Sequence, residues 1–310
     1  MKSIVALGIT LMACGKVSDT LSDGRPADST SADAPSVDAA PPRCNPTSPF
    51  GTPMALDALN STAYDVVGSL STDELTLFMS SDRTGAGAVG GLDVYVATRP
   101  SRTAAFGAPS VLAGINTTGD EGSPLVTADG LFMYVFTHTA ATGYDILVAQ
   151  RASTAIAFGT PTAIPSLNSA GISDAGSYVL PDNSAIYFQS NRNGSNDDVL
   201  RAARNVGGTF DPATAVSIPT SNAEDSAVLT PDELTIFYAS NAPGGAGGFD
   251  IYMATRSTKA DGFGTPQRQT ALSTTDDEFP SWISPDGCEL YFSRTVTGRS
   301  SDIFIARRAP

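Results

Sequence analysis

The chain has 310 residues, of which 41% are hydrophobic and 8% aromatic, so it has enough apolar side chain to fold without a metal. It carries 18 Lys and Arg against 32 Asp and Glu, a formal net charge of -14. Because such a surface repels phosphate backbones, nucleic acid is excluded as a partner. An anionic membrane surface is disfavoured for the same reason, unless a lipid anchors the chain.

The chain begins with a short apolar segment that follows a lysine. Lys2 gives a positive start, residues 4–13 are mostly apolar, and residues 11–14 read Leu-Met-Ala-Cys, which resembles the lipobox of a bacterial lipoprotein. The apolar run is too short to span a bilayer, so we expect residues 1–13 to be a signal peptide and Cys14 to carry lipid. An ordinary secretory signal that contains a cysteine is the alternative. Glycine rather than aspartate follows Cys14, and by resemblance to the sorting rules of enteric lipoproteins this implies the outer membrane.

Residues 14–49 are rich in Ser, Ala, Asp and Pro and have almost no large apolar side chain. Such a segment buries too little surface to offset the entropy cost of ordering it. We therefore expect a disordered tether, with the folded domain occupying residues 50–310 and held on the order of 30 Å from the membrane.

One motif, Asp-(Val/Ile)-x-x-Ala-x-Arg, occurs five times in residues 50–310. Self-similarity at a fixed period indicates copies of one supersecondary unit that must stack on its neighbours to bury its apolar face. The five aspartates that open the motif are Asp93, Asp145, Asp198, Asp250 and Asp302.

Each copy also contains two further strand signals and a turn. A Phe-(Gly/Asp)-x-(Pro/Ala) segment recurs every 52 to 56 residues, beginning at Phe50, and each copy has an Asp turn followed five residues later by an aromatic residue. Apolar runs on both sides of such turns predict hairpins, and no helical period is present. Four strands in about 52 residues are typical of a propeller blade. The sequence therefore predicts an all-β, five-bladed β-propeller with four antiparallel strands per blade.

The phase of the repeat predicts how the ring closes. The domain starts with the strand at Phe50 and ends just after the last Asp302 motif, so the last blade lacks its outer strand and the N-terminal strand completes it. Cys44 precedes that closing strand, and Cys288 follows the first turn of the last blade. Because both positions lie at the same end of the blade, we expect a Cys44–Cys288 disulfide in an oxidising envelope.

Two turn sequences, Ser284-Pro285-Asp286-Gly287 and Thr230-Pro231-Asp232, together with the repeated Asp-Ile-Tyr strand, resemble the β-propeller repeats of the TolB type. The resemblance covers about residues 50–310. It implies the propeller fold, whereas repeats of this type occur in binding proteins, in surface proteins and beside peptidase domains.

A carboxylate stands eight residues before each turn aspartate, at the start of the expected inner strand. We expect these acids to share one face of the ring, where they would either bind a cation or basic partner or accept hydrogen bonds that hold the strand starts. Asp120, Asp225 and Asp277 add charge in some blades. The eight residues of this candidate binding face are Asp65, Glu121, Asp174, Glu224, Glu278, Asp120, Asp225 and Asp277.

The sequence lacks the motifs of the common catalytic, metal and cofactor sites. His138 is the one histidine, no Gly-x-Ser-x-Gly motif occurs, and no phosphate-binding loop is present, so we expect no catalytic triad, metal or cofactor. The arginines that end the five motifs are expected to pair with carboxylates of neighbouring blades. We predict a monomeric, non-enzymatic scaffold that binds an unidentified envelope protein. A glycoside hydrolase-like propeller with channel carboxylates is the alternative.

Overall fold

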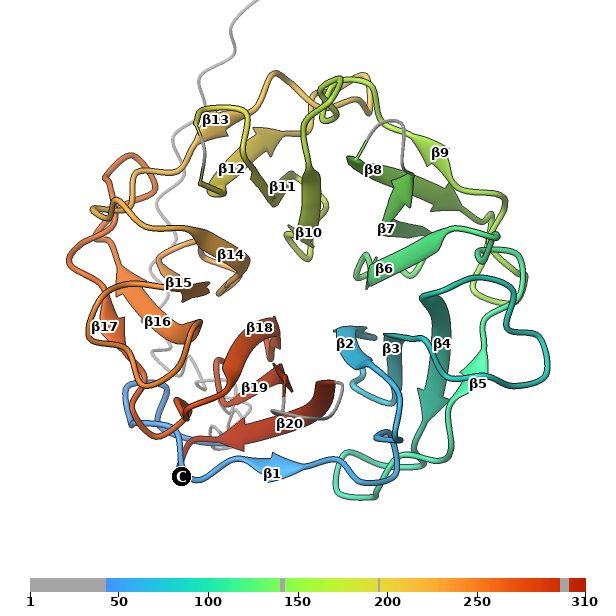
Figure 1. Ribbon diagram of the computed structural model, residues 1–310, viewed down its shortest axis with the longest axis horizontal. Helices are drawn as coiled ribbons and strands as arrows, with labels where there is room; N and C mark the ends of the chain where they lie inside the picture. Colours follow the sequence, from blue (N-terminus) through green and yellow to red (C-terminus); the bar gives the residue numbers. More distant parts are fainter. Residues whose placement is uncertain (1–42, 140–142, 195, 296–300) are drawn as a thin grey trace, which may run out of the picture. The chain divides into compact units, whose positions relative to one another are not determined.

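The computed structural model describes residues 43–139, 143–194, 196–295 and 301–310, which form five four-stranded antiparallel sheets around an axis (Figure 1). The predicted signal peptide 1–13, the lipidation residue Cys14 and the tether as far as residue 42 lie outside these residues. The described residues contain no helix, and therefore no helix that is long and apolar enough to cross a membrane. The predicted five-bladed β-propeller is confirmed.

Each blade is a meander whose first strand lies next to the axis, and the order along the sheet follows the chain in blades one to four. Blade one contains β2 (Asp65–Leu70), β3 (Thr76–Ser81), β4 (Asp93–Thr98) and β5 (Ser110–Val111). Blade two contains β6 (Asp120–Val126), β7 (Phe132–Thr139), β8 (Gly143–Gln150) and β9 (Thr162–Ala163). Blade three contains β10 (Asp174–Val179), β11 (Ala185–Ser190), β12 (Asp198–Ala203) and β13 (Thr214–Ala215). Blade four contains β14 (Glu224–Leu229), β15 (Thr235–Ser240), β16 (Asp250–Thr255) and β17 (Gln267–Arg268).

Blade five is assembled from both ends of the domain. It contains β18 (Asp277–Ile283), β19 (Glu289–Thr295), β20 (Ser301–Arg307) and, as its outer strand, β1 (Met54–Ala55). Met54 pairs with Ile305 in the antiparallel register, and the side chain of Asn60 exchanges two hydrogen bonds with the backbone of Ile303. The N-terminal strand therefore closes the ring, which leaves no blade with an unpaired third strand.

Residues 43–49, at the end of the segment predicted as a tether, are attached to this closure. Cys44 and Cys288 form a disulfide, with their Cα atoms 5.7 Å apart. Arg43 lies between the turns of two blades, with its guanidinium 2.9 Å from Glu74 of blade one and also paired with Asp286 of blade five. These contacts fix the chain seven residues before Phe50 and link the first blade to the last.

A β-bulge interrupts every inner strand near its middle. The extra residue bends the strand and increases its twist. In blades two and four the bulge includes a serine in the left-handed region, Ser123 with φ 47 and Ser226 with φ 52. Blade three has Gly176 there, with φ 58, a conformation that costs glycine nothing. Residues of these bulges line the central cavity.

The arginines that end the repeated motif pack in a way that the sequence did not indicate. In the described residues none of the five forms an ion pair; instead, each guanidinium lies over a phenylalanine ring, for example Arg99 over Phe106 at 4.5 Å and Arg151 over Phe158 at 4.2 Å. The prediction of salt bridges between blades is therefore wrong. Cation–π contact and burial of the aliphatic stem favour this arrangement over an exposed charge pair.

The disulfide closes a loop with a sequence separation of 244 residues, so it strongly restricts the unfolded chain. The Cys44→Ser, Cys288→Ser double variant is expected to lose about 2–5 kcal/mol of the free energy of unfolding. Urea denaturation of oxidised wild type and variant measures this difference. Wild type in reducing agent is the control and should match the variant; equal midpoints for all three samples would contradict the expectation.

Candidate functional site

The five acids that begin the inner strands are buried. Their exposed fractions are 0%, 2%, 0%, 5% and 0% for Asp65, Glu121, Asp174, Glu224 and Glu278. Four of them, all except Glu224, accept hydrogen bonds from the loop that precedes their own strand; Asp65, for instance, accepts from the amide and hydroxyl of Ser61. Such a carboxylate satisfies backbone donors where the chain enters the blade. Those four side chains hold the loops in place, and all five offer little surface to a partner.

Three of the five acids also pair with an arginine. Arg192 donates to Asp174 at 2.7 Å, Arg294 donates to Glu278 at 2.8 Å, and Arg83 pairs with Asp65. Each of these guanidiniums also donates to the carbonyl of a leucine in the loop before the inner strand. The buried charge is thus compensated in blades one, three and five.

Blades two and four lack this compensation. Glu121 bonds to the amide and hydroxyl of Thr117 and has no arginine partner among the described residues, and burial raises its pKa. Glu224 has a buried Oε1 atom with no hydrogen-bond partner in the described part of the chain, and desolvation raises the pKa of Glu224 to about 7.

The three additional acids occupy two different positions. Asp120 and Asp277 stand before the buried acid, and each accepts a hydrogen bond from a backbone amide of the preceding blade, that of Leu92 and that of Phe249. They therefore join blades. Asp225 stands after the buried acid, two positions farther along the inner strand, and lines the central cavity at the axis. Of the eight predicted residues, Asp225 is the one that lines the central cavity.

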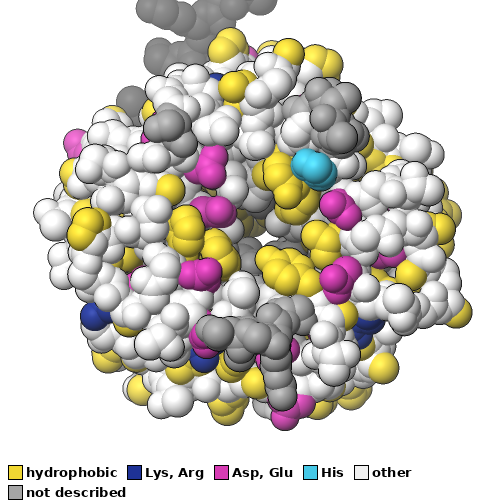
Figure 2. Space-filling view, viewed as in Figure 1, with side chains coloured by type: hydrophobic (Ala, Val, Ile, Leu, Met, Phe, Trp, Pro, Cys, Tyr) yellow, Lys and Arg dark blue, Asp and Glu magenta, His cyan; other side chains and the backbone are white. Residues whose placement is uncertain are grey.

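This cavity has a volume of about 540 Å³ and opens at the end of the ring where the inner strands begin. Figure 2 shows the hollow, with hydrophobic and acidic side chains around its mouth and the visible Lys and Arg toward the periphery. The bulge residues Ser123, Gly176, Ser226 and Ser281 line this cavity and also a smaller adjoining cavity of about 20 Å³ on the axis.

Three equivalent positions in the blades supply most of the wall. The first is the residue after each buried acid, and it holds Val66, Gly122, Ala175, Asp225 and Phe279. The second is its partner on the next strand, which lines the cavity as Ser80, Phe136, Gln189 and Ser293. The third precedes the aspartate of the repeated motif and contributes Leu92, Tyr144 and Asp197.

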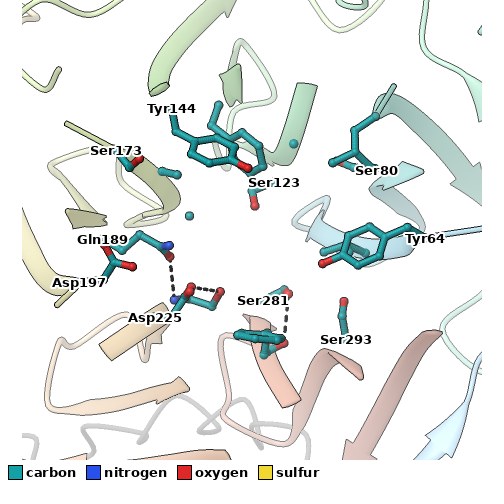
Figure 3. A pocket seen from close by; sticks show the side chains of 18 of the residues that line it. Tyr64, Ser80, Ser123, Tyr144, Ser173, Gln189, Asp197, Asp225, Ser281 and Ser293 are labelled. Atoms are coloured by element: carbon teal, nitrogen blue, oxygen red, sulfur yellow. Dashed lines mark hydrogen bonds between the residues drawn. The ribbon is translucent and has the colours of Figure 1, made fainter. Parts of the chain in front are cut away.

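These positions give the cavity two unlike sides. Asp197, Gln189 and Asp225 lie together on the side of blades three and four, whereas Tyr64 and Tyr144 extend over the cavity from other blades (Figure 3). The amide of Ser226 donates to Gln189 Oε1 at 3.1 Å, and the Ser226 hydroxyl donates to Asp225 at 2.6 Å. These bonds hold both side chains at the cavity wall.

The acidic side of the cavity carries uncompensated negative charge. Desolvation and the neighbouring Asp197 carboxylate raise the pKa of Asp225 to about 6, and desolvation and Asp198 raise the pKa of Asp197. Burial and the charge of Asp225 also raise the pKa of Tyr64. None of the described lining residues is Lys or Arg. The cavity therefore favours a cation over an anion.

Two other candidates fall outside this site. His138 packs against Tyr144, with ring centroids 4.6 Å apart, and does not line the cavity. In the part of the chain that the structure describes, no group of three or more His, Cys, Asp or Glu side chains is arranged to hold a metal ion.

The chain matches no protein-family model and no curated protein. Solved structures share its fold. TolB from Acinetobacter baumannii superposes with a TM-score of 0.51 and 17% identity, covering 81% of this chain and 57% of TolB. A GH43 β-xylosidase/α-arabinofuranosidase from a compost microbial metagenome gives a TM-score of 0.52 with 12% identity, covering 83% of this chain and 95% of the enzyme.

A third similar structure is the catalytic domain of the Coprinopsis cinerea GH62 α-L-arabinofuranosidase, with a TM-score of 0.51 and 9% identity over 84% of this chain and 97% of that domain. At such identities the similarity shows the fold alone. It includes both TolB and glycosidases, so the function must be argued from the cavity.

The uncompensated Glu224 predicts a pH-dependent stability. The folded protein holds the Glu224 proton more tightly than the unfolded chain does. Protonated Glu224 therefore adds to the free energy of unfolding fully below pH 4.5, and this addition is lost as the pH rises through about 7. Because glutamine does not ionise, we expect the free energy of unfolding of Glu224→Gln to exceed that of wild type by about 2 kcal/mol at pH 8 and to equal it near pH 4.

Asp65→Asn is the matched variant, since it leaves the charge of Arg83 without its buried partner. Its free energy of unfolding should be about 3 kcal/mol below that of wild type across the same pH range. Urea denaturation at pH 4, 6 and 8 measures both effects. A Glu224→Gln variant that is destabilised at pH 8 as strongly as Asp65→Asn would show that the charged carboxylate stabilises the loop.

Proposed function

We propose that this protein is a non-enzymatic binding module that receives a positively charged group of a partner protein in its axial cavity. The observation that carries the proposal is the pair Asp197 and Asp225, which face the cavity beside aromatic side chains and lack a lining cation among the described residues. A lysine or arginine side chain would complement both features, by charge and by contact with the ring faces.

The position of the cavity supports recognition of a protruding side chain or chain end. Its mouth is open at the centre of the ring, and Tyr64 and Tyr144 stand over it, with Tyr144 36% exposed. A long basic side chain has the reach to place its head group beside Asp225 while its stem lies against Phe279. The net charge of -14 would speed the approach of a basic partner more than it would strengthen the complex.

The cellular setting is part of the proposal. We infer that the chain is a bacterial envelope lipoprotein, cleaved after residue 13, anchored through lipid on Cys14 in the outer membrane and held by a tether. The TolB-like fold supports an envelope location, and the Cys44–Cys288 disulfide fits an oxidising compartment. The partner is then an envelope protein with an accessible basic segment.

Glycoside hydrolysis is the second candidate. Two carboxylates on adjacent blades, one of them with a pKa of about 6, resemble the acid and base that this reaction needs. The GH43 and GH62 structures show that the same fold supports such enzymes. In this reading Asp225 would be the proton donor and Asp197 the base.

Binding of N-acetyl-lysine amide, measured by calorimetry against the uncharged N-acetyl-norleucine amide, tests the proposal. Wild type should prefer the lysine compound, and Asp225→Asn or Asp197→Asn should weaken its binding at least ~10-fold, about 1.4 kcal/mol. Asp57→Asn is the control, because Asp57 is exposed and lies outside the cavity. It removes the same charge and should leave the affinity unchanged.

Two outcomes contradict the proposal. Equal affinity for both compounds would show that the carboxylates do not select charge. Release of nitrophenol from 4-nitrophenyl arabinofuranoside or xyloside by wild type, lost in Asp225→Asn, would establish the glycosidase reading instead.

A further inference from the structure

The arginine that ends each repeated motif has the same role in most blades. Its Nε atom donates to a backbone carbonyl: Arg99 to Glu74, Arg151 to Gly130, Arg204 to Gly208 and Arg256 to Glu233, at 2.6–3.1 Å. In these four arginines the bond satisfies the Nε donor, and the cation–π contact stabilises the guanidinium.

Arg308 of blade five breaks the pattern. Its Nε atom is buried and has no hydrogen-bond partner among the described residues. Its guanidinium lies over Phe50 at 4.4 Å and near Phe237 at 5.9 Å. In the part of the chain that the structure describes, its side chain makes one polar contact, 4.0 Å from Nη2 to the sulfur of Met253. Burial lowers the pKa of Arg308, as it does that of Arg151, so the missing Nε bond is what distinguishes Arg308.

A cavity of about 720 Å³ lies against Arg308, between blades four and five at the end of the ring that carries the Pro-Asp turns. Segment 46–49 forms one edge, so the ring closure itself creates the space. Prolines, Phe237 and Met253 make much of the wall apolar; the lining prolines are Pro46, Pro49, Pro231 and Pro285. The volume falls in the usual range for small-molecule sites.

Two carboxylates also line this cavity, but both are engaged. Asp286 is paired with Arg43 and accepts from the Ser284 hydroxyl, and these contacts lower its pKa. Asp232 accepts from the Thr230 hydroxyl and the Leu234 amide within its own turn. Arg308 is therefore the cation of the cavity that has no partner charge in the described residues.

We propose that this cavity between blades four and five binds a small organic carboxylate with an apolar body. The carboxylate would accept hydrogen bonds from the guanidinium of Arg308, and the apolar body would lie on Phe237, Met253 and the prolines. A guanidinium that lines a largely apolar wall selects a ligand with both features, because a neutral apolar molecule would leave the Arg308 charge without a partner. This site is separate from the axial cavity and does not depend on the function proposed for it.

Calorimetric titration of the full oxidised chain with 4-phenylbutyrate, against the neutral 4-phenylbutyramide, tests the proposal. On wild type the acid should bind at least ~10-fold more tightly than the amide. Arg308→Gln should remove that preference. Arg256→Gln is the matched control, since it changes the equivalent arginine of blade four, which stacks on Phe263 and bonds to Glu233, and it should keep the preference.

The acid and amide comparison on unaltered protein needs no variant to fold. Equal affinities, or no binding of the acid at millimolar concentration, would overturn the proposal, as would an equal loss of affinity in Arg308→Gln and Arg256→Gln.

Discussion

Closure of the ring is the constraint on which the rest of this structure depends. Blade five contains both ends of the folded domain. Three contacts hold these ends together: the pairing of β1 with β20, the Cys44–Cys288 disulfide and the bridge made by Arg43. With the ends joined, the five inner strands are held around one axis. Both cavities follow from this, one at the centre of the ring and one beside the closing segment.

Side chains that recur in all five blades have structural roles, whereas side chains that differ in one blade are candidates for a function. A buried acid stands at the start of all five inner strands, and a stacked arginine ends all five motifs, because every blade needs its loop and its outer strand fixed. The exceptions are Asp225, where other blades have Val, Gly, Ala or Phe, and Arg308, which lacks the carbonyl bond of its counterparts. Each exception faces a cavity.

The sequence predicted the blade count, the strand order and the closing strand, because the period of the motif and its phase depend on local patterning alone. It also pointed to the cysteines that the structure places in a disulfide. It did not predict the partners of Arg99 or Arg308, since a stacked guanidinium and a salt bridge have the same sequence pattern. It grouped Asp120 and Asp225 by charge, although they occupy different positions of the repeat: Asp120, before the buried acid, bonds to a neighbouring blade, and Asp225, after the buried acid, lines the axial cavity. Aligning the five repeats at the position after the buried acid would have separated them, whereas Asp197 and Gln189 become visible only once the strand register is known.

The central claim is that the Asp225 carboxylate is partly desolvated, has no compensating cation among the described residues and binds a positively charged group. The ¹³C NMR titration of the Asp225 side-chain carboxyl, followed without ligand and then with saturating N-acetyl-lysine amide, tests this most directly. The account predicts a pKa near 6 in the free protein, because Asp197 and burial disfavour the charge, and a clear fall when the ammonium group binds. A pKa close to 4 in the free protein, or one that the lysine compound leaves unchanged, would contradict it.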